Sequence, residues 1–307
     1  MNKLIKQFTY LYTRSFEIIK NTGIKSFIKK MVIYTFSSKK IDLDTFVINK
    51  DDTLDDFFVK FGTDKGSLDG KKTYDTLYKN SNKKEFKNYL DWINRKNPKN
   101  YEYQLGHNSA PIYESFFLKR RLEKVKILEL GVANGHSIAS WHHYFLNATI
   151  YGIDNKETYK FFYESKIVRY TQVDIFNKKK IKNFIKKNGN FDFIIDDSVH
   201  NESGILTNLI NFYPALNSKG IYFVEDFRGI DKAKELNVQH NLQNNGKWMV
   251  GDPITIRGIF DNINKKKMFE HLTLKKDILE YIIENTNKAE IIYQDHPWGA
   301  IGVLQKK

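Results

Sequence analysis

Short apolar runs dominate the chain after residue 120, and stretches with helical spacing of apolar residues separate them. The runs have the length and composition of buried strands, and they cover residues 125–130, 149–154, 168–173, 191–196 and 220–225. Helices are predicted between some of these runs, over 137–145 and 178–187. Strands that alternate with helices predict an α/β fold, with a mostly parallel sheet covered on both faces.

The last two apolar runs predict a different kind of strand pair. Residues 289–293 and 299–304 are separated by only a short turn. Such a short connection joins antiparallel neighbours, whereas parallel strands need a long crossover. The sheet is therefore expected to end in a C-terminal antiparallel hairpin.

The regions before residue 121 follow other patterns. Residues 1–50 are predicted to form a basic amphipathic extension that is helical at its start, because apolar residues recur there at helical spacing with Lys between them. Residues 51–120 read as a mainly helical cap region, interrupted by the turn-rich island 61–67. Residues 121–307 form the predicted α/β domain.

Composition narrows the class of protein. A chain of 307 residues can bury a full core, and the absence of cysteine excludes disulfides and thiolate metal sites. The net charge is +14, but residues 1–40 alone hold nine basic residues and one acid, which leaves +6 for the rest. A nucleic-acid binder is therefore not expected. No run approaches the ~20 apolar residues of a membrane span, and no signal peptide is recognisable, which favours a cytoplasmic protein.

The basic start of the chain leaves alternatives open. A basic amphipathic segment can lie on an anionic membrane surface, so residues 1–40 predict a peripheral contact with the inner face of the membrane. The same pattern suits a helix packed on the body of the protein or on a second subunit. We leave open both the membrane contact and a homo-oligomer.

Two of the predicted strands end in pairs of carboxylates, Asp196-Asp197 and Glu225-Asp226. If the strands are neighbours, about 4.8 Å apart, the four acids converge at one edge of the sheet, where unpaired charges are costly. A cation would relieve this cost, and oxygen ligands suit magnesium, calcium or manganese. Side-chain alternation puts Asp196 and Asp197 on opposite faces, and His200 is a candidate base three residues beyond Asp197.

The segment 129–135 follows the first strand and opens a helix, and it predicts a cofactor loop. Its glycines, Gly131 and Gly135, let the backbone approach a ligand closely. Asp154 ends the second strand, where an acid can accept hydrogen bonds from both hydroxyls of a ribose. A cofactor that contains a nucleoside is therefore expected.

The same loop disfavours a dinucleotide. The dinucleotide fingerprint G-x-G-x-x-G requires glycines that admit a pyrophosphate, but Ala133 and His136 occupy its second and third positions. Glu129 also fits poorly beside a pyrophosphate, although it can face the cationic amine of a methionine moiety. An NAD-dependent oxidoreductase is thus the weaker interpretation.

This loop pattern resembles motif I of the class I S-adenosylmethionine-dependent methyltransferases. Further motifs resemble the mycinamicin VI-type sugar O-methyltransferases and related methyltransferases of polysaccharide clusters; they lie at 61–67, 127–132, 140–145, 150–154, 195–200 and 224–226. The resemblance implies a Rossmann-like sheet with a helical N-terminal extension. It also implies methyl transfer from S-adenosylmethionine to a sugar hydroxyl, with magnesium.

The resemblance assigns roles residue by residue. It implies His200 as the catalytic base and Asp197, Glu225 and Asp226 as metal ligands. The residues expected to bind the cofactor come from the island 61–67 and from the strand ends: Thr63, Asp64, Lys65, Glu129, Gly131, Ala133, Asn134, Gly135, Ser137, Asp154, Asp174 and Asp196. His107 and Tyr113 are candidates for an acceptor pocket. Ser198-Val199 replaces the usual Gly-Ser of the family, which leaves the acceptor undetermined.

The acceptor class remains open at this stage. A sugar, a nucleotide sugar or a glycan is favoured, within surface polysaccharide or glycoside biosynthesis. A catechol-type small molecule is an alternative, because such methyltransferases also use a metal and carboxylates. A non-catalytic scaffold at the membrane surface is the alternative from another class of protein.

Overall fold

The computed structural model describes residues 40–49, 51–67, 107–156, 161–228, 230–231, 254–271, 274–294 and 299–307. The chain divides into two compact units, 1–41 and 42–307, and the architecture below is that of the second. Residues 1–39 and 50 of the predicted N-terminal extension and residues 68–106 of the predicted cap region lie outside the described residues. The helices of the extension and its membrane contact therefore stay predictions. The predicted boundary near residue 120 also stays a prediction.

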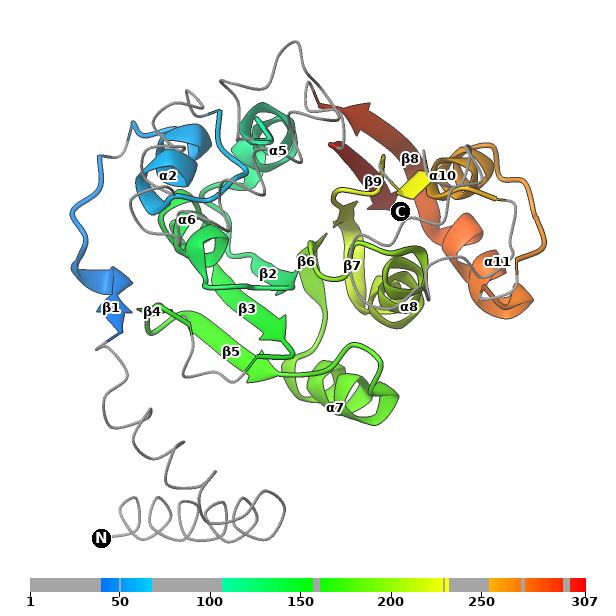
Figure 1. Cartoon of the computed structure of the whole chain (residues 1–307), viewed down its shortest axis with the longest axis horizontal. Coiled ribbons are helices and arrows are strands. Elements are labelled where there is room, and N and C mark those ends of the chain that lie inside the picture. Colours follow the sequence, from blue (N-terminus) through cyan, green and yellow to red (C-terminus); the bar gives the residue numbers. More distant parts are fainter. Residues whose placement is uncertain are drawn as a thin grey trace, which may run out of the picture. The chain divides into compact units, whose positions relative to one another are not determined.

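The described part of the second unit contains a seven-stranded sheet in the order β5-β3-β2-β6-β7-β9-β8 (Figure 1). The strands are β2 (Lys126–Leu130), β3 (Thr149–Asp154), β5 (Val168–Gln172), β6 (Phe191–Asp196), β7 (Leu216–Val224), β8 (Thr286–Tyr293) and β9 (Ala300–Lys306). The first five in this order pair in parallel, and β9 pairs antiparallel with both β7 and β8. The Rossmann-like, mostly parallel sheet with a C-terminal antiparallel hairpin is confirmed.

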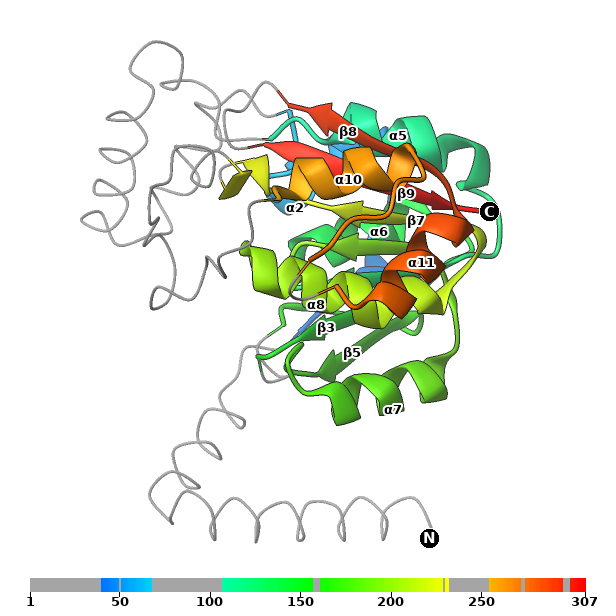
Figure 2. The same ribbon diagram turned by 90° about the vertical axis from the view of Figure 1, so that its right-hand side faces the viewer.

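Helices cover both faces of this sheet (Figures 1 and 2). One face carries α2 (Leu54–Phe61), α5 (Ala110–Phe117) and α6 (His136–Tyr144), and the other carries α7 (Lys178–Asn188), α8 (Glu202–Phe212), α10 (Ile256–Asn264) and α11 (Lys276–Asn285). Side chains alternate between the two faces along each strand, and they contribute to two hydrophobic cores. Ile127 and Phe193 point to the first face, and Leu128 and Ile194 point to the second.

Smaller elements complete the described chain. A two-stranded sheet pairs β1 (Ile41–Asp42) with β4 (Tyr163–Glu164). Single 3-10 turns follow as η1 (Leu43–Thr45), η2 (Leu118–Arg120) and η4 (Tyr213–Ala215). None of the described helices is long and apolar enough to cross a bilayer.

Local capping sets where the loops of interest begin. Thr53 and Asp56 form a capping box at the start of α2, and Gly62 ends this helix in the left-handed conformation at φ 74°. Residues 63–67 of the island therefore leave α2 at a defined point. On the other face, the side chain of Asn201 accepts a hydrogen bond from the backbone N–H of Gly204 and so starts α8.

The register of the parallel strands aligns their carboxyl ends. Leu130 pairs with Asp196, and Asp196 pairs with Val224. The residues that follow these three positions therefore emerge side by side at one edge of the sheet, which is where ligands bind in open α/β sheets. The strands β6 and β7, which end in the acid pairs, are neighbours as predicted.

Candidate functional site

The loop after β2 lies against the loop after β6, and Gly131 is the point of contact. Its φ is +85°, and a Cβ added there would lie 2.2 Å from the backbone oxygen of Asp197 and 2.5 Å from the Cα of Ser198. The backbone N–H of Gly131 donates to the carbonyl of Ile153 at 2.9 Å. Only glycine satisfies both the conformation and the close approach at this position.

Asp154 organises the same loop from the end of β3. Its Oδ2 accepts hydrogen bonds from the backbone N–H groups of Val132 and Ala133, each at 2.9 Å, and its Oδ1 accepts one from Lys156. Asp174, after β5, accepts the N–H of Phe176 through Oδ1. Both carboxylates are therefore held in place by backbone donors.

A cavity of about 610 Å³ opens between these loops. Its lining includes Gly131, Asp154, Asp174, Ile175, Phe176 and Val199. The structure thus brings together the glycine loop and the two strand-end acids that the sequence singled out. The apolar residues of the lining were not predicted, because no local signal distinguishes Ile175 or Phe176 from ordinary core residues.

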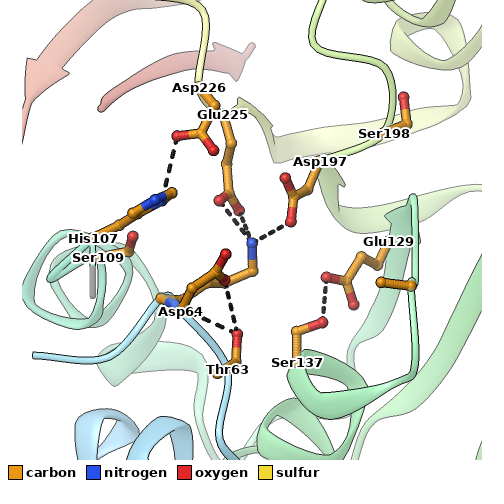
Figure 3. Close-up of polar contacts among 12 residues, drawn as sticks. Thr63, Asp64, His107, Ser109, Glu129, Ser137, Asp197, Ser198, Glu225 and Asp226 are labelled. Carbon is orange, nitrogen blue, oxygen red and sulfur yellow. Dashed lines mark hydrogen bonds and ion pairs between the residues drawn. The ribbon is translucent and has the colours of Figure 1, made fainter. Parts of the chain in front are cut away.

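Glu129 is fully buried beneath the start of α6 and is only partly satisfied. The Ser137 hydroxyl donates to its Oε1 at 2.6 Å (Figure 3), whereas its Oε2 has no hydrogen-bond partner among the described residues. Burial raises the pKa of Glu129 to about 8, although Lys65 acts in the opposite direction. A buried carboxylate oxygen without a donor is a ready acceptor for a cationic group of a ligand.

Other predicted cofactor residues of this loop form the turn into α6. Ala133 has φ +51°, and Gly135 is the left-handed N-cap of α6 at φ +94°. The carbonyl of Asn134 accepts the N–H of Phe162 at 3.0 Å. These residues shape the backbone of the loop, and a role for their side chains stays a prediction.

We refer to Lys65, Asp197, Glu225 and Asp226 as the acidic cluster. The Lys65 ammonium donates to Asp197 Oδ2 at 2.5 Å and to Glu225 Oε1 and Oε2 at 2.8 and 2.7 Å. In Figure 3 the carboxylates of Asp197 and Glu225 turn toward one point, where their dashed lines meet. The Tyr113 hydroxyl also donates to Glu225. Glu225 is therefore engaged by a cation and by a phenol, both of them buried.

Asp226 points to the other side of the cluster. It has φ +57°, an uncommon conformation for a residue other than glycine, and its Oδ1 lies 3.4 Å from Nδ1 of His107. Burial opposes protonation of His107, but Asp226 and Asp64 raise its pKa. The amide of Gln294 donates to the His107 carbonyl and to the Ser109 hydroxyl. No sequence signal marked Gln294, because only the folding of the chain brings this residue, which directly follows β8, to residue 107.

Three residues of this edge could hold a metal ion. Ligand atoms of Asp197, His200 and Asp226 all lie within 4.8 Å of one another, and His200 Nε2 lies 3.6 Å from Asp197 Oδ1. Carboxylate oxygens with an imidazole suit a divalent cation. Of the metal ligands implied by the resemblance, Asp197 and Asp226 belong to this group, whereas both oxygens of Glu225 face Lys65. The group also contains His200, the implied base.

Asp196 lies apart from the cluster. Its carboxylate accepts hydrogen bonds from Ser198, Asn208 and Tyr222, and burial raises its pKa to about 7. The predicted convergence of four carboxylates is thus reduced to three, because alternation along β6 turns Asp196 toward α8. This arrangement anchors the loop after β6, and a contact of Asp196 with a cofactor stays a prediction.

The island after α2 lies next to the cluster. Its backbone pairs with the segment 107–109, since His107 donates to the carbonyl of Asp64 at 2.6 Å and Ser109 to that of Lys65 at 2.8 Å. The Thr63 hydroxyl lies 3.4 Å from Asp64 Oδ1 (Figure 3). The expected contacts of Thr63, Asp64 and Lys65 with a cofactor stay predictions. The ion pairs of Lys65 were not predicted.

Comparison with known proteins gives a consistent picture. No family model matches the chain. It is 28% identical over 127 residues to mycinamicin VI 2''-O-methyltransferase of Micromonospora griseorubida, covering 39% of this chain and 31% of that protein. It is 28% identical over 129 residues to 8-demethyl-8-alpha-L-rhamnosyl tetracenomycin-C 2'-O-methyltransferase of Streptomyces olivaceus, covering 40% and 34%. The matched part therefore spans about a third of the length of these relatives.

Among solved structures, the MycE methyltransferase in complex with Mg, SAH and mycinamycin VI aligns with a TM-score of 0.48 and 20% identity. The alignment covers 64% of this chain and 49% of that one. The curated relatives are sugar O-methyltransferases, as the motif pattern predicted. The chain is similar in sequence to sugar O-methyltransferases, and the resemblance is confirmed.

Proposed function

We propose that the protein is an S-adenosylmethionine- and divalent-metal-dependent O-methyltransferase that acts on a sugar hydroxyl. The observation that carries this proposal is the position of the cavity. It is bounded by Gly131, Asp154 and Asp174, and its loops lead directly to the edge that holds Asp197 and Asp226. A methyl donor and a hydroxyl acceptor could therefore be bound side by side.

The residues of the cavity fit the proposed cofactor. Asp154 would accept hydrogen bonds from ribose hydroxyls, and Asp174 and Phe176 would contact the base. The unpartnered Oε2 of Glu129 would accept a hydrogen bond from the amino group of the methionine moiety. This last contact would satisfy an oxygen that has no hydrogen-bond partner among the described residues.

The residues of the cluster fit a divalent cation and an acceptor. Asp197 and Asp226 would hold the metal, with His200 beside them and Glu225 as a further ligand implied by the resemblance. A bound cation lowers the pKa of a coordinated hydroxyl and orients it. His200, one-third exposed at the rim of the site, would accept the proton of the acceptor hydroxyl. His107 and Tyr113 would border the acceptor.

The acceptor and its setting belong to the same proposal. The names of the relatives specify sugar-bearing substrates, which supports a glycoside, nucleotide sugar or glycan. A place in surface polysaccharide biosynthesis is suggested by the resemblance to polysaccharide-cluster methyltransferases. A cytoplasmic location was predicted from the sequence.

Titration calorimetry with S-adenosylhomocysteine tests the cofactor. The protein should bind it in the micromolar range, and Asp154→Ala should weaken binding by about 100-fold, because the ribose contact and the loop anchor are lost together. Asp277→Ala, an exposed acid in the first turn of α11, is the matched control and should bind normally. Absence of binding in the wild type would overturn the methyltransferase proposal and favour the scaffold interpretation.

Methyl transfer from labelled S-adenosylmethionine then tests the acceptor. Nucleotide sugars and glycosides should be methylated in magnesium buffer and not in EDTA, and His200→Ala should lower kcat by about 100-fold or more. Methylation of catechols in place of sugars would contradict the proposed acceptor. Full turnover by His200→Ala would exclude His200 as the base.

A further inference from the structure

Lys65 is a fully buried cation that contacts two of the proposed metal ligands, Asp197 and Glu225. Only 1% of its surface is exposed. Burial disfavours its charged form, yet Asp197 and Glu225 raise the pKa of Lys65 well above its ordinary value. The ammonium forms ion pairs with both carboxylates, and these contacts compensate the cost of burying its charge.

The backbone around Lys65 fixes where the ammonium lies. The island starts at the left-handed cap Gly62, and the carbonyls of Asp64 and Lys65 accept the N–H groups of His107 and Ser109. The backbone N–H of Lys65 itself points to the Thr63 hydroxyl at 3.4 Å. Because the loop is held from both sides, Lys65 is presented to the cluster by the fold.

All three donors of the ammonium are used by carboxylates. An ammonium group has three N–H donors, and the three acceptors within 2.8 Å are Asp197 Oδ2 and the two oxygens of Glu225. The other oxygen of Asp197 faces His200. Asp197 therefore belongs at once to the ion pair and to the group that could bind a metal.

The charges around Lys65 are unbalanced without it. Besides Asp197 and Glu225, the ammonium interacts electrostatically with Asp64, and with Glu129 when that carboxyl is ionised. Like charges that share a buried site are unfavourable. Among the described residues, removal of the Lys65 ammonium would leave the neutral Tyr113 as the side-chain hydrogen-bond donor to Glu225. A divalent cation bound to Asp197 would compensate the same charges and would be repelled by Lys65.

We propose that Lys65 is a built-in counter-ion that competes with the divalent cation for Asp197 and Glu225. In the metal-free protein it holds the two carboxylates together, and in the metal-bound protein it weakens the hold on the ion. This role rests on the metal site of the proposed function and makes Lys65 a positioning residue. It does not require that methyl transfer occur.

The test compares unfolding temperatures with Mn²⁺ and with EDTA. In EDTA, Lys65→Met should unfold at a lower temperature than the wild type, because Asp197 and Glu225 lose their counter-ion. The rise in unfolding temperature on adding Mn²⁺ should be larger for Lys65→Met than for the wild type. By titration calorimetry, Lys65→Met should bind Mn²⁺ about tenfold more tightly or better, since a repelling charge is removed.

Two variants serve as controls. Lys126→Met removes a partly buried lysine at the other end of β2, where its ammonium donates to the carbonyl of Asn188 at 3.0 Å. Tyr113→Phe removes the other donor to Glu225 without a change of charge. Each of these variants should lower the unfolding temperature by the same amount in Mn²⁺ as it does in EDTA.

The results distinguish competition between Lys65 and the divalent cation from a role of Lys65 in packing alone. An equal drop in unfolding temperature for Lys65→Met in both buffers, or weaker binding of Mn²⁺ than by the wild type, would count against competition. Either result would show that Lys65 contributes only packing or ligand support, and would overturn the proposal. If Mn²⁺ stabilises neither protein, the metal site and the proposal both fall. Failure to bind S-adenosylhomocysteine would overturn the proposed function alone and leave this comparison valid.

A double variant covers the case in which Lys65→Met does not fold in EDTA. Lys65→Met with Glu225→Gln removes one positive and one negative charge together. It should be more stable in EDTA than the single variant, because no unpaired carboxylate is left at residue 225. A double variant no more stable than the single one would contradict a counter-ion role.

Discussion

The two halves of the candidate site are built in different ways. The cofactor cavity is formed within residues 131–203, by loops that directly follow successive strands of the sheet. The acidic cluster instead joins distant parts of the chain, and Lys65 and Glu225 are 160 positions apart. The cavity is a product of local loop geometry, and the cluster is a product of long-range charge pairing.

The two halves therefore depend on different interactions. In the cavity, backbone N–H groups satisfy Asp154 and Asp174, so the acids are held whatever the neighbouring side chains are. In the cluster, Asp197 and Glu225 are satisfied by side chains from other segments, and a single substitution changes the balance of charge. Substitutions that disturb the backbone should therefore disrupt the cavity, and substitutions that change a charge should disrupt the cluster.

The largest effect is expected where the two halves touch. Gly131→Ala places a Cβ 2.2 Å from the backbone oxygen of Asp197, and backbone hydrogen bonds to Ile153 and Leu130 hold the two residues in place. The free energy of unfolding should fall by about 4 kcal/mol or more. Gly62→Ala is the control, since Gly62 also has positive φ but no atom lies within 4 Å of the added Cβ, and it should lose only about 1 kcal/mol. Chemical denaturation measures both variants, and equal losses of unfolding free energy for Gly131→Ala and Gly62→Ala would show that this contact is not important for stability.

A smaller but more selective effect is expected from Asp197→Asn. The change removes one charged oxygen ligand from the group with His200 and Asp226, so the dissociation constant for Mn²⁺ should rise about 100-fold. Binding of S-adenosylhomocysteine should change by less than about threefold, because the cavity is satisfied by backbone donors. Parallel calorimetric titrations check this, and loss of both ligands together would show that the halves are not independent.

The smallest effect is a dependence of cofactor binding on pH, and it should come from Glu129 at the end of β2. The pKa of Glu129 is raised to about 8, so the free protein keeps this carboxyl protonated at neutral pH. A cationic amine is bound best by the ionised form, and affinity for S-adenosylhomocysteine should rise about tenfold between pH 6.5 and 8.5. Glu129→Gln should bind more weakly and lose this slope, whereas an unchanged slope would exclude Glu129 as its origin.

The same shift has a consequence for stability. A raised pKa means that the folded protein holds the Glu129 proton more tightly than the unfolded chain does. The contribution of Glu129 is therefore fully favourable below its ordinary pKa of 4.5, and stability falls as the pH rises from there to about 8. Chemical denaturation of the wild type and Glu129→Gln across this range measures the difference.

Most of the sheet was predictable because strand signals are local. The expected runs at 149–154 and 191–196 coincide with β3 and β6. β7 begins at Leu216 rather than at residue 220, because Asn217 to Lys219 are polar and add no apolar signal while the backbone pairing continues. The acid pairs at the ends of β6 and β7 and the glycine loop after β2 were also recognisable from the sequence.

The fold class, the edge of the sheet that carries the candidate site, and the residue types at that edge thus follow from the sequence alone. They do so because periodicity and loop motifs act over a few residues. The folded chain, and no local pattern, establishes that Glu225 pairs with Lys65 and Tyr113, that Asp196 turns to α8, and that Asp226 faces His107. These partners depend on the path of the whole chain. Buried charges must be balanced in three dimensions, and no pattern within one segment records which distant residue provides the balance.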